Sequence, residues 1–190
     1  SDMKHRDRLT KTAYLQYLRC PQEFWLQMNQ PLFVSQPYSL EYEHLRQQGY
    51  AVQKLARTLD RFRPCEGVVF DFERPFQTAD LYARCDIVAT DQITGAVDIY
   101  EIKAAGSVKE DHYDDVAFQR LTAERAGFSV RRCFVITMNG EYVRRGNIDP
   151  QDIFVVTDVT DAVEARMDTT AREAKEAVRA CPGQRASALP

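Results

Sequence analysis

One stretch of this 190-residue chain, residues 82–103, limits more than any other what the chain can fold into. Apolar and β-branched residues fill both of its ends, and the polar cluster TDQITG between them is typical of a turn. We therefore expect an antiparallel hairpin that is centred near Ile93 and places Asp86 directly across from Glu101. Because successive strand side chains point to opposite faces, Glu101 and Lys103 share one face of this hairpin.

This pairing of carboxylates has two explanations. Facing carboxylates repel each other unless a cation or a proton lies between them, and Lys103 relieves only part of the repulsion between Asp86 and Glu101. Oxygen ligands of this kind suit a hard divalent ion such as Mg²⁺ or Mn²⁺. The spacing D…ExK is also common by chance, and an edge hairpin with scattered surface charges is its more frequent origin. The residues of the hairpin alone leave both explanations open.

The rest of the chain supplies further helices and strands around this hairpin. Periodicity and composition predict helices at 9–28, with a kink or a break at Cys20-Pro21, and at 39–59, 111–126 and 161–180. Apolar runs predict strands at 68–76, 130–138 and 153–157, and the turn signal Asn139-Gly140 predicts a return strand that begins at Tyr142-Val143. This order indicates an α/β fold with a mixed central sheet flanked by helices, in which a crossover helix makes the strand at 130–138 parallel to the strand before it.

Composition excludes several classes of protein. A hydrophobic content of 44% is enough for a packed core, and a net charge of -3 means that any nucleic-acid site has to be a local basic patch. No apolar run reaches the length of about 18 residues that a membrane-spanning helix needs. The five cysteines are widely spaced, without a CxxC pair, which argues against a zinc ribbon or a disulfide framework and favours the cytoplasm. Candidate cations for nucleic-acid contact are Arg57, Arg61, Arg63, Arg84, Lys109, Arg120 and Arg125.

Several motifs in one order resemble the RecB-like branch of the PD-(D/E)xK nucleases, which includes the CRISPR adaptation nucleases. The central motifs are Asp86 on one strand, Glu101-Ile102-Lys103 on the next and Gln119 on the following helix. The opening LTKTAYLQYLRCPQEFWL is similar to the start of RecB-like exonucleases. The segments DVAFQRLTAERAG, MNGEYVRRGNID and FVVTDVTDAV resemble one uncharacterised bacterial family, whose longer members carry a C-terminal RNase H-like domain. The resemblance spans most of the chain and implies a restriction-endonuclease-like fold.

The resemblance also implies a role for each residue of the central motifs. Asp86 and Glu101 would ligate Mg²⁺ or Mn²⁺, with the backbone carbonyl of Ile102 as a third oxygen. Lys103 would orient or activate the attacking water, and a lysine beside a cation can have a depressed pKa, which allows it to act as a base. Gln119 would contact the lysine, the water or the DNA backbone. The implied partner is DNA, as single strands or ends, without any membrane.

The chain departs from the pattern of active relatives at three places. Many RecB-like nucleases carry a metal-binding histidine where this chain has Gln53, which leaves Gln53 or His44 as candidate further ligands. Many also carry a tyrosine where this chain has Ala123. In iron–sulfur members, a cysteine at the place of Cys20 joins three C-terminal cysteines, but only Cys181 is present at that end here, so we expect no iron–sulfur cluster in this chain.

Two functions therefore remain open for the chain. The first is a metal-dependent deoxyribonuclease that acts in repair or defence. The second, favoured by the missing histidine and tyrosine, is a nucleic-acid-binding or assembly module whose site is weak or inactive, as part of a larger two-domain nuclease. We expect one nuclease domain at 1–180, with a helical part at 1–62, a catalytic sheet core at 63–157, a peripheral helix at 158–180 and a flexible tail at 181–190.

Overall fold

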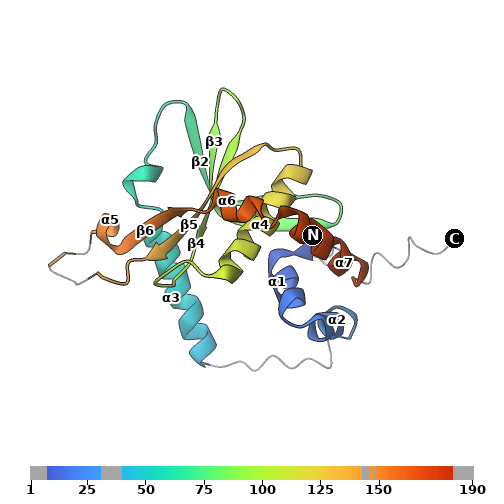
Figure 1. The fold of residues 1–190 in the computed structure, drawn as a ribbon. Helices are drawn as coiled ribbons and strands as arrows, with labels where there is room; N and C mark the ends of the chain where they lie inside the picture. The colour runs from blue at the N-terminus through green and yellow to red at the C-terminus, as the bar shows by residue number, and fades with distance from the viewer. Residues whose placement is uncertain (1–7, 31–39, 143–145, 148, 182–190) are drawn as a thin grey trace.

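A mixed β-sheet with helices on both faces forms the centre of the molecule (Figure 1). The computed structural model describes residues 8–30, 40–142, 146–147 and 149–181. In chain order the elements are β1 (Leu9–Thr10), α1 (Lys11–Arg19), α2 (Pro21–Asn29), α3 (Leu40–Ala56), a 3₁₀ turn (Asp60–Phe62), β2 (Val68–Gln77), β3 (Leu81–Asp91), β4 (Val97–Ile102), α4 (Glu110–Arg125), β5 (Val130–Met138), α5 (Pro150–Ile153), β6 (Phe154–Asp158), α6 (Thr160–Glu164) and α7 (Met167–Arg179).

The sheet is built on β3, which has neighbours along both of its edges. β2 runs antiparallel along one edge for its whole length. Two strands share the other edge, since β4 pairs antiparallel with residues 87–90 and the short β1 pairs parallel with residues 81–82. β5 follows parallel to β4, and β6 follows antiparallel to β5. The predicted mixed sheet, and the parallel crossover through α4, are therefore confirmed.

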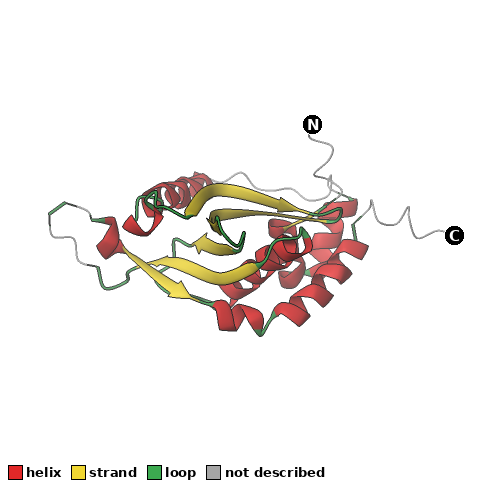
Figure 2. Cartoon of the chain, turned by 90° about the horizontal axis from the view of Figure 1, so that it is seen from above, coloured by secondary structure: helices red, strands yellow, loops and turns green. Residues whose placement is uncertain are grey.

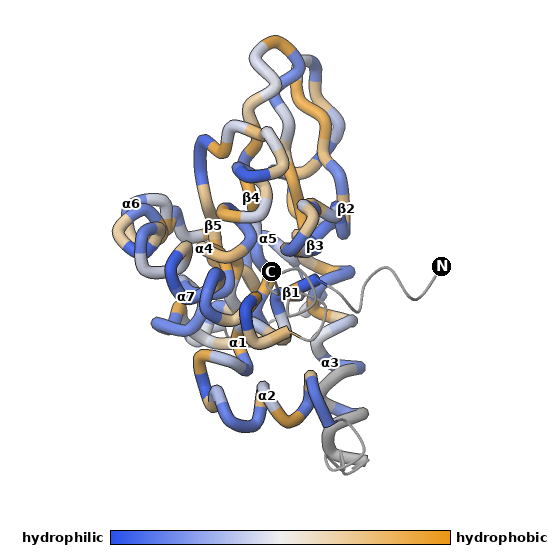
Figure 3. The backbone as a smooth tube through the Cα atoms, turned by 90° about the vertical axis from the view of Figure 1, so that its right-hand side faces the viewer, coloured by the Kyte–Doolittle hydropathy of each residue, from blue (hydrophilic) through white to orange (hydrophobic). Residues whose placement is uncertain are grey.

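The two faces of the sheet have separate cores, which the helices cover from opposite sides (Figure 2). On one face, Val52, Leu55 and Ala56 of α3 pack against sheet residues that include Tyr100 and Ile102 of β4. On the other face, α4 and α7 pack with α1, and hydrophobic residues run along β3 and β4 between the two layers (Figure 3). The alternation of strand side chains thus leaves Glu101 pointing away from the α3 core, towards α4.

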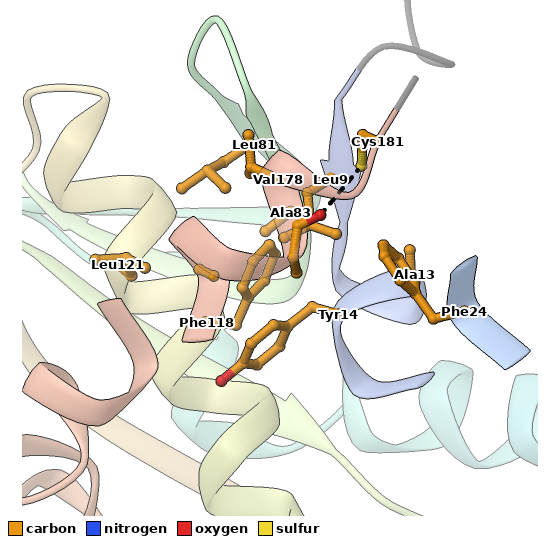
Figure 4. Packing of buried hydrophobic residues seen from close by; sticks show 12 residues of the cluster. Leu9, Ala13, Tyr14, Phe24, Leu81, Ala83, Phe118, Leu121, Val178 and Cys181 are labelled. Carbon is orange, nitrogen blue, oxygen red and sulfur yellow. Dashed lines mark hydrogen bonds between the residues drawn. The ribbon is translucent and has the colours of Figure 1, made fainter. Parts of the chain in front are cut away.

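The core around α1 joins both ends of the described chain to the sheet (Figure 4). The ring of Phe118 on α4 stacks on Tyr14 of α1, with 4.7 Å between the ring centroids. Burying an aromatic ring of this size contributes roughly 1.5–3 kcal/mol. Leu9 and Val178 lie in the same cluster, so β1, α1 and α7 are held together. This packing fixes the start of α1 beside the sheet.

Three helical predictions differ from the structure in detail. The helix expected at 9–28 is two helices, because Cys20-Pro21 ends α1 and begins α2, as the predicted break allows. The helix expected at 161–180 is also divided, into α6 and α7. α7 is packed more closely than its weak apolar stripe predicts, because alanines such as Ala174 and Ala177 let it approach the core closely. At Gly49 in α3, an added Cβ would meet no atom within 4 Å, so close packing does not explain this glycine.

The predicted return strand after Asn139-Gly140 is wrong where the structure describes it. Tyr142 lies in an irregular segment, and Val143 lies outside the described residues. The strand that pairs with β5 is β6, with Met138 opposite Phe154. Sequence reasoning missed this pairing because an excursion of the chain separates the two strands. None of the helices in the described ranges is long and apolar enough to cross a membrane.

The start of α4 contains a group that makes folding stability depend on pH. The backbone N–H of Lys109 donates to Nδ1 of His112 over 3.0 Å, so the cap requires an unprotonated Nδ1. Burial, and the charge of Lys103, lower the pKa of His112. The unfolded chain therefore binds a proton more readily than the folded chain, and the stability from this cap is lost as the pH falls below the ordinary histidine pKa.

We expect His112→Leu, whose side chain cannot accept a hydrogen bond, to remove most of this dependence. At about pH 7.5 the variant should be less stable by about 1 kcal/mol, the usual contribution of a cap, and the difference should disappear near pH 5. Thermal denaturation of both proteins across this range checks the prediction. A difference in stability between the two proteins that grows as the pH falls would contradict the assigned role of His112 Nδ1.

Candidate active site

The candidate site lies where β3 and β4 separate. Their ladder ends at Ile87 opposite Tyr100, one residue before Asp86 and Glu101. Further along the same edge of β3, the pairing with β1 begins. Asp86 therefore lies in a gap between two strands that share one edge, and β1 leads directly into Lys11 at the start of α1. The structure thus places Asp86 and Glu101 at neighbouring positions on the two strands, as the hairpin predicts.

Asp86 is a buried carboxylate whose negative charge is only partly offset by its hydrogen bonds and by nearby cations. Its Oδ2 accepts the backbone N–H of Ile102 over 2.8 Å, and its Oδ1 accepts Nε2 of Gln53 over a long 3.4 Å. Burial raises the pKa of Asp86 well above its ordinary value, and the neighbouring Glu101 carboxylate raises it further, whereas Lys11 and the Ile102 N–H lower it. Ionised Asp86 is therefore an unfavourable group that an additional cation would stabilise.

Glu101 lies at the centre of a hydrogen-bonded network with α4. Gln119 donates from Nε2 both to Glu101 Oε2, over 2.7 Å, and to Asp115 Oδ1, over 2.8 Å. Lys103 Nζ lies 2.6 Å from Asp115 Oδ2 and 3.3 Å from Glu101 Oε1. All four residues are brought together by the end of β4 and by one face of α4, on which Asp115 and Gln119 are one turn apart. The Oε1 atom of Gln119 is buried without a hydrogen-bond partner among the described residues.

Lys11 completes this network from the other end of the chain. Its Nζ lies 3.1 Å from Glu101 Oε1 and 3.1 Å from Asp115 Oδ1. Burial alone would lower the pKa of Lys11, but the carboxylates of Glu101, Asp115 and Asp86 outweigh burial and raise it. In the same way, the charges of Lys11 and Lys103 outweigh burial and lower the pKa of Asp115. Lys11 and Asp115 therefore form a buried, charged pair at the site.

Sequence reasoning missed both Lys11 and Asp115. Asp115 carries a usable signal, because it precedes Gln119 by one helical turn and so shares its face. Lys11 carries none, since its contact with Glu101 joins residues 90 positions apart. That contact exists only because β1 pairs with β3, and a two-residue strand has no recognisable pattern.

This cluster contains carboxylate oxygens, the type of ligand that a hard divalent cation prefers. Three carboxylates, those of Asp86, Glu101 and Asp115, face two ammonium groups, those of Lys11 and Lys103, which leaves one net negative charge. Within the described residues, no three acidic, histidine or cysteine side chains are arranged to hold a metal ion. Asp86 and Glu101 can supply carboxylate oxygens to an ion only when the ammonium of Lys11 gives way, because that ammonium now satisfies Glu101.

Two cavities meet at this cluster. One, of about 490 Å³, is lined by Thr10, Lys11, Thr12, Gln53, Tyr82, Arg84, Asp86 and Glu101. The other, of about 480 Å³, is lined by Lys11, Thr12, Leu15, Leu18, Arg19, Lys103, Asp111, Asp114 and Asp115. Lys11 and Thr12 belong to both linings, so the start of α1 divides the two cavities. Asp86 is therefore reached from the first cavity, and Lys103 from the second.

The remaining candidate residues lie elsewhere or have other partners. His44 is exposed, and its Nε2 lies 3.0 Å from Nε2 of Gln48, without a contact to the cluster, whereas Gln53 does contact Asp86. Ala123 is buried in the core beside Ile99. Several candidate cations are engaged by carboxylates: Arg57 by Glu73, Arg63 by Asp60, and Arg120 by Glu124 and Glu164. Of the two proposed further metal ligands, only Gln53 is at the site.

Comparison with proteins of known structure identifies a protein with a similar fold. An alkaline exonuclease (LHK-Exo) from Laribacter hongkongensis matches with a TM-score of 0.51 and 13% sequence identity, over 92% of this chain and 89% of that chain. The two proteins share a fold. SSO0001 matches with a TM-score of 0.45 and 12% identity, over 94% of this chain and 87% of that chain. No protein-family model matches the chain, and no curated protein sequence matches it.

Proposed function

We propose that the chain is a metal-dependent nuclease of the PD-(D/E)xK type, from the RecB-like branch, that hydrolyses phosphodiester bonds in DNA. The observation that carries the proposal is the convergence of Asp86, Glu101, Lys103 and Gln119 at the gap between β3 and β4. These are the residues of the D…ExK and glutamine motifs, and they meet in the fold of an alkaline exonuclease. Convergence of four motif residues from three elements is not expected of scattered surface charges.

In this proposal each side chain has a distinct task. Asp86 and Glu101 would hold Mg²⁺ or Mn²⁺, together with the Ile102 carbonyl, and Gln53 lies close enough to Asp86 to orient it. The bound ion would polarise the scissile phosphate and lower the pKa of an attacking water. Gln119 holds Glu101 through a buried hydrogen bond, so it fixes the orientation of that carboxylate.

In the metal-free protein, Lys103 is a cation. The sequence allowed a depressed lysine pKa, but burial, which lowers the pKa of Lys103, is outweighed by Glu101 and Asp115, which raise it. An ammonium group held 2.6 Å from Asp115 can orient a water or stabilise the charge that develops on the phosphate.

Cleavage of labelled DNA in the presence of Mg²⁺ or Mn²⁺ tests the proposal. We expect hydrolysis that stops in EDTA and falls on the order of 1,000-fold in Glu101→Gln, because one charged metal ligand becomes neutral. Single strands, blunt duplexes and closed circular DNA as separate substrates distinguish action on strands or ends from internal cleavage. Equal rates in Glu101→Gln and the wild type would contradict this assignment of the site.

A second function, a nucleic-acid-binding or assembly module with an inactive site, is favoured by one observation. Lys11 already neutralises Glu101 and Asp115, and Gln53 contacts Asp86 only weakly. Salt-dependent DNA binding without turnover in either metal would select this function. In both cases we place the protein in the cytoplasm, in agreement with its five free thiols, and regard an RNase H-like domain or another nuclease subunit as a candidate partner.

A further inference from the structure

We propose that one surface beside the site binds a single strand of nucleic acid by stacking its bases. This stacking surface consists of Tyr50 and Lys54 on α3, of Arg57, which directly follows the end of α3, and of Phe72 on β2. The inference rests on the proposed function, because it specifies that the substrate of the proposed nuclease is an unpaired strand and describes how that strand reaches Asp86. It is carried by exposed aromatic rings that are paired with cations and lie next to the carboxylate cluster.

The helical part of the surface follows from the spacing of its residues. Positions 50 and 54 fall on one face of α3, opposite the face on which Val52 and Ala56 pack against the sheet, and Arg57 follows directly after the end of the helix. Tyr50 is 55% exposed, although a ring of this size is usually buried in part. The ammonium of Lys54 lies over the Tyr50 ring, 4.8 Å from its centroid. An exposed ring with a cation beside it presents a π-face together with a positive charge.

The strand part of the surface repeats this pairing. Phe72 is 42% exposed, and the guanidinium of Arg57 lies over its ring at 5.2 Å from the centroid. Arg57 and Phe72 also line a groove of about 480 Å³, together with apolar residues such as the exposed Val69 and with Arg63. Stacking of successive bases on aromatic side chains, with cations along the phosphates, is the usual way in which proteins hold single strands.

The surface is continuous with the candidate active site. Gln53 lies on α3 between Tyr50 and Arg57, and its amide contacts Asp86. Phe72 is paired with Ile87, the residue that follows Asp86 on β3. In this proposal the strand runs from the two rings past Gln53, which lines the cavity that contains Asp86 and Arg84. A base-paired duplex cannot stack on these rings, because its bases already stack on each other.

A β-strand from a second protein fits this surface less well. β2 is an edge strand on the side away from β3, but Pro75 lacks an N–H and Glu73 has a φ of 53°, which interrupts a regular ladder. Among the described residues, Glu73 is the carboxylate that forms an ion pair with Arg57, at 3.7 Å. Since this ion pair is long and partly exposed, a phosphate can replace Glu73 at the guanidinium.

Binding of a labelled oligothymidine of about 20 nucleotides, measured by fluorescence anisotropy in EDTA, tests the proposal without any cleavage. We expect Tyr50→Ala and Phe72→Ala each to weaken binding roughly 5- to 100-fold, as the loss of one stacked base implies. Glu73→Gln should tighten binding, because Arg57 loses its competing carboxylate. Ile93→Ala is the control, since Ile93 is a 92% exposed apolar residue in the turn between β3 and β4 and does not belong to the stacking surface.

The outcomes separate this proposal from the proposed nuclease function. If the Tyr50→Ala/Phe72→Ala protein binds the oligomer as tightly as the wild type, or if the wild type binds no single strand, the stacking surface is wrong, whatever the cleavage assay shows. If binding depends on both rings and no metal supports cleavage, the surface stands and the nuclease assignment fails. An oligouridine of equal length shows whether the strand is DNA or RNA, and binding of either through these rings supports the surface.

Discussion

Asp86→Asn is expected to abolish cleavage and, in the same preparation, to raise the stability of the metal-free protein. The loss of activity should be on the order of 1,000-fold, because a charged metal ligand becomes neutral. The gain in stability follows from the raised pKa of Asp86, which burial and the Glu101 carboxylate cause. An amide oxygen can still accept the Ile102 N–H that now binds Oδ2, so the substitution removes a charge and keeps the backbone contact.

The pH dependence of folding stability shows why Asp86→Asn is expected to stabilise the protein. Asp86 has a higher pKa in the folded chain than in the unfolded chain, so its contribution to stability is present at low pH and is lost as the pH rises through the folded pKa. Thermal denaturation in EDTA should therefore show the variant gaining on the wild type between about pH 4 and pH 8. A variant that is less stable than the wild type at the upper end would contradict this account of Asp86.

Asp98→Asn is the matched control for that experiment. Asp98 is 8% exposed and Asp86 is 9% exposed, and the two lie on paired strands of the same sheet. Asp98, however, is fully engaged, since Arg131 donates to both of its oxygens over 3.1 and 2.9 Å and the Arg132 N–H donates over 3.0 Å. We expect Asp98→Asn to destabilise the protein. If the two substitutions change the stability in opposite directions, although the two aspartates are equally buried, Asp86 is kept for function at a cost to stability.

The parts of the site that are local in sequence were predictable. The register that faces Asp86 with Glu101 depends on one turn, and strand alternation then places Glu101 on the face opposite Tyr100. For these two features a short segment contains all the information that the prediction needs. Gln119, in contrast, was expected from the resemblance to RecB-like nucleases and not from a local pattern, and it is fully buried in the structure.

The parts that depend on distant packing were not predictable. Lys11 reaches Glu101 because a two-residue strand and the core around Tyr14 fix the start of α1 beside β3. The close fit of α7 depends on small residues, whose weak hydrophobicity conceals how near they allow two helices to come. The stacking surface likewise needs Phe72, on a strand, to lie under Arg57, in the turn after α3. Sequence patterns can identify the residues of such a group, but they do not show that these residues contact each other.

Lys11→Met is expected to destabilise the metal-free protein and to strengthen its response to a divalent cation. The side chain of Lys11 is 21% exposed and satisfies Glu101 and Asp115, so its removal leaves buried carboxylates without their cation. Breaking a buried ion pair in this way typically costs about 3–5 kcal/mol, and we expect about 3 kcal/mol here because part of the side chain reaches solvent. Urea denaturation in EDTA measures this loss.

The response to Mn²⁺ decides what Lys11 does. If the ammonium of Lys11 neutralises Glu101 in place of a metal ion, Mn²⁺ has to displace this ammonium in the wild type. In Lys11→Met there is no ammonium to displace. Titration calorimetry should then show tighter Mn²⁺ binding to the variant, and Mn²⁺ should recover most of the lost stability, since a ligand stabilises the folded state that binds it. Lys175→Met, on the exposed side of α7, is the control and should change neither quantity.

Other outcomes would assign Lys11 differently. Weaker Mn²⁺ binding in Lys11→Met would mean that the lysine shapes the carboxylates into the binding arrangement and does not compete with the ion. A variant that binds Mn²⁺ normally and is stable, yet no longer cleaves DNA, would place the ammonium of Lys11 against the substrate phosphate, since Lys11 also lines the cavity that contains Asp86. Competition with the ion is the outcome that we expect, because Lys11 Nζ lies 3.1 Å from Glu101 Oε1, and Glu101 is the carboxylate that the ion would share with Asp86.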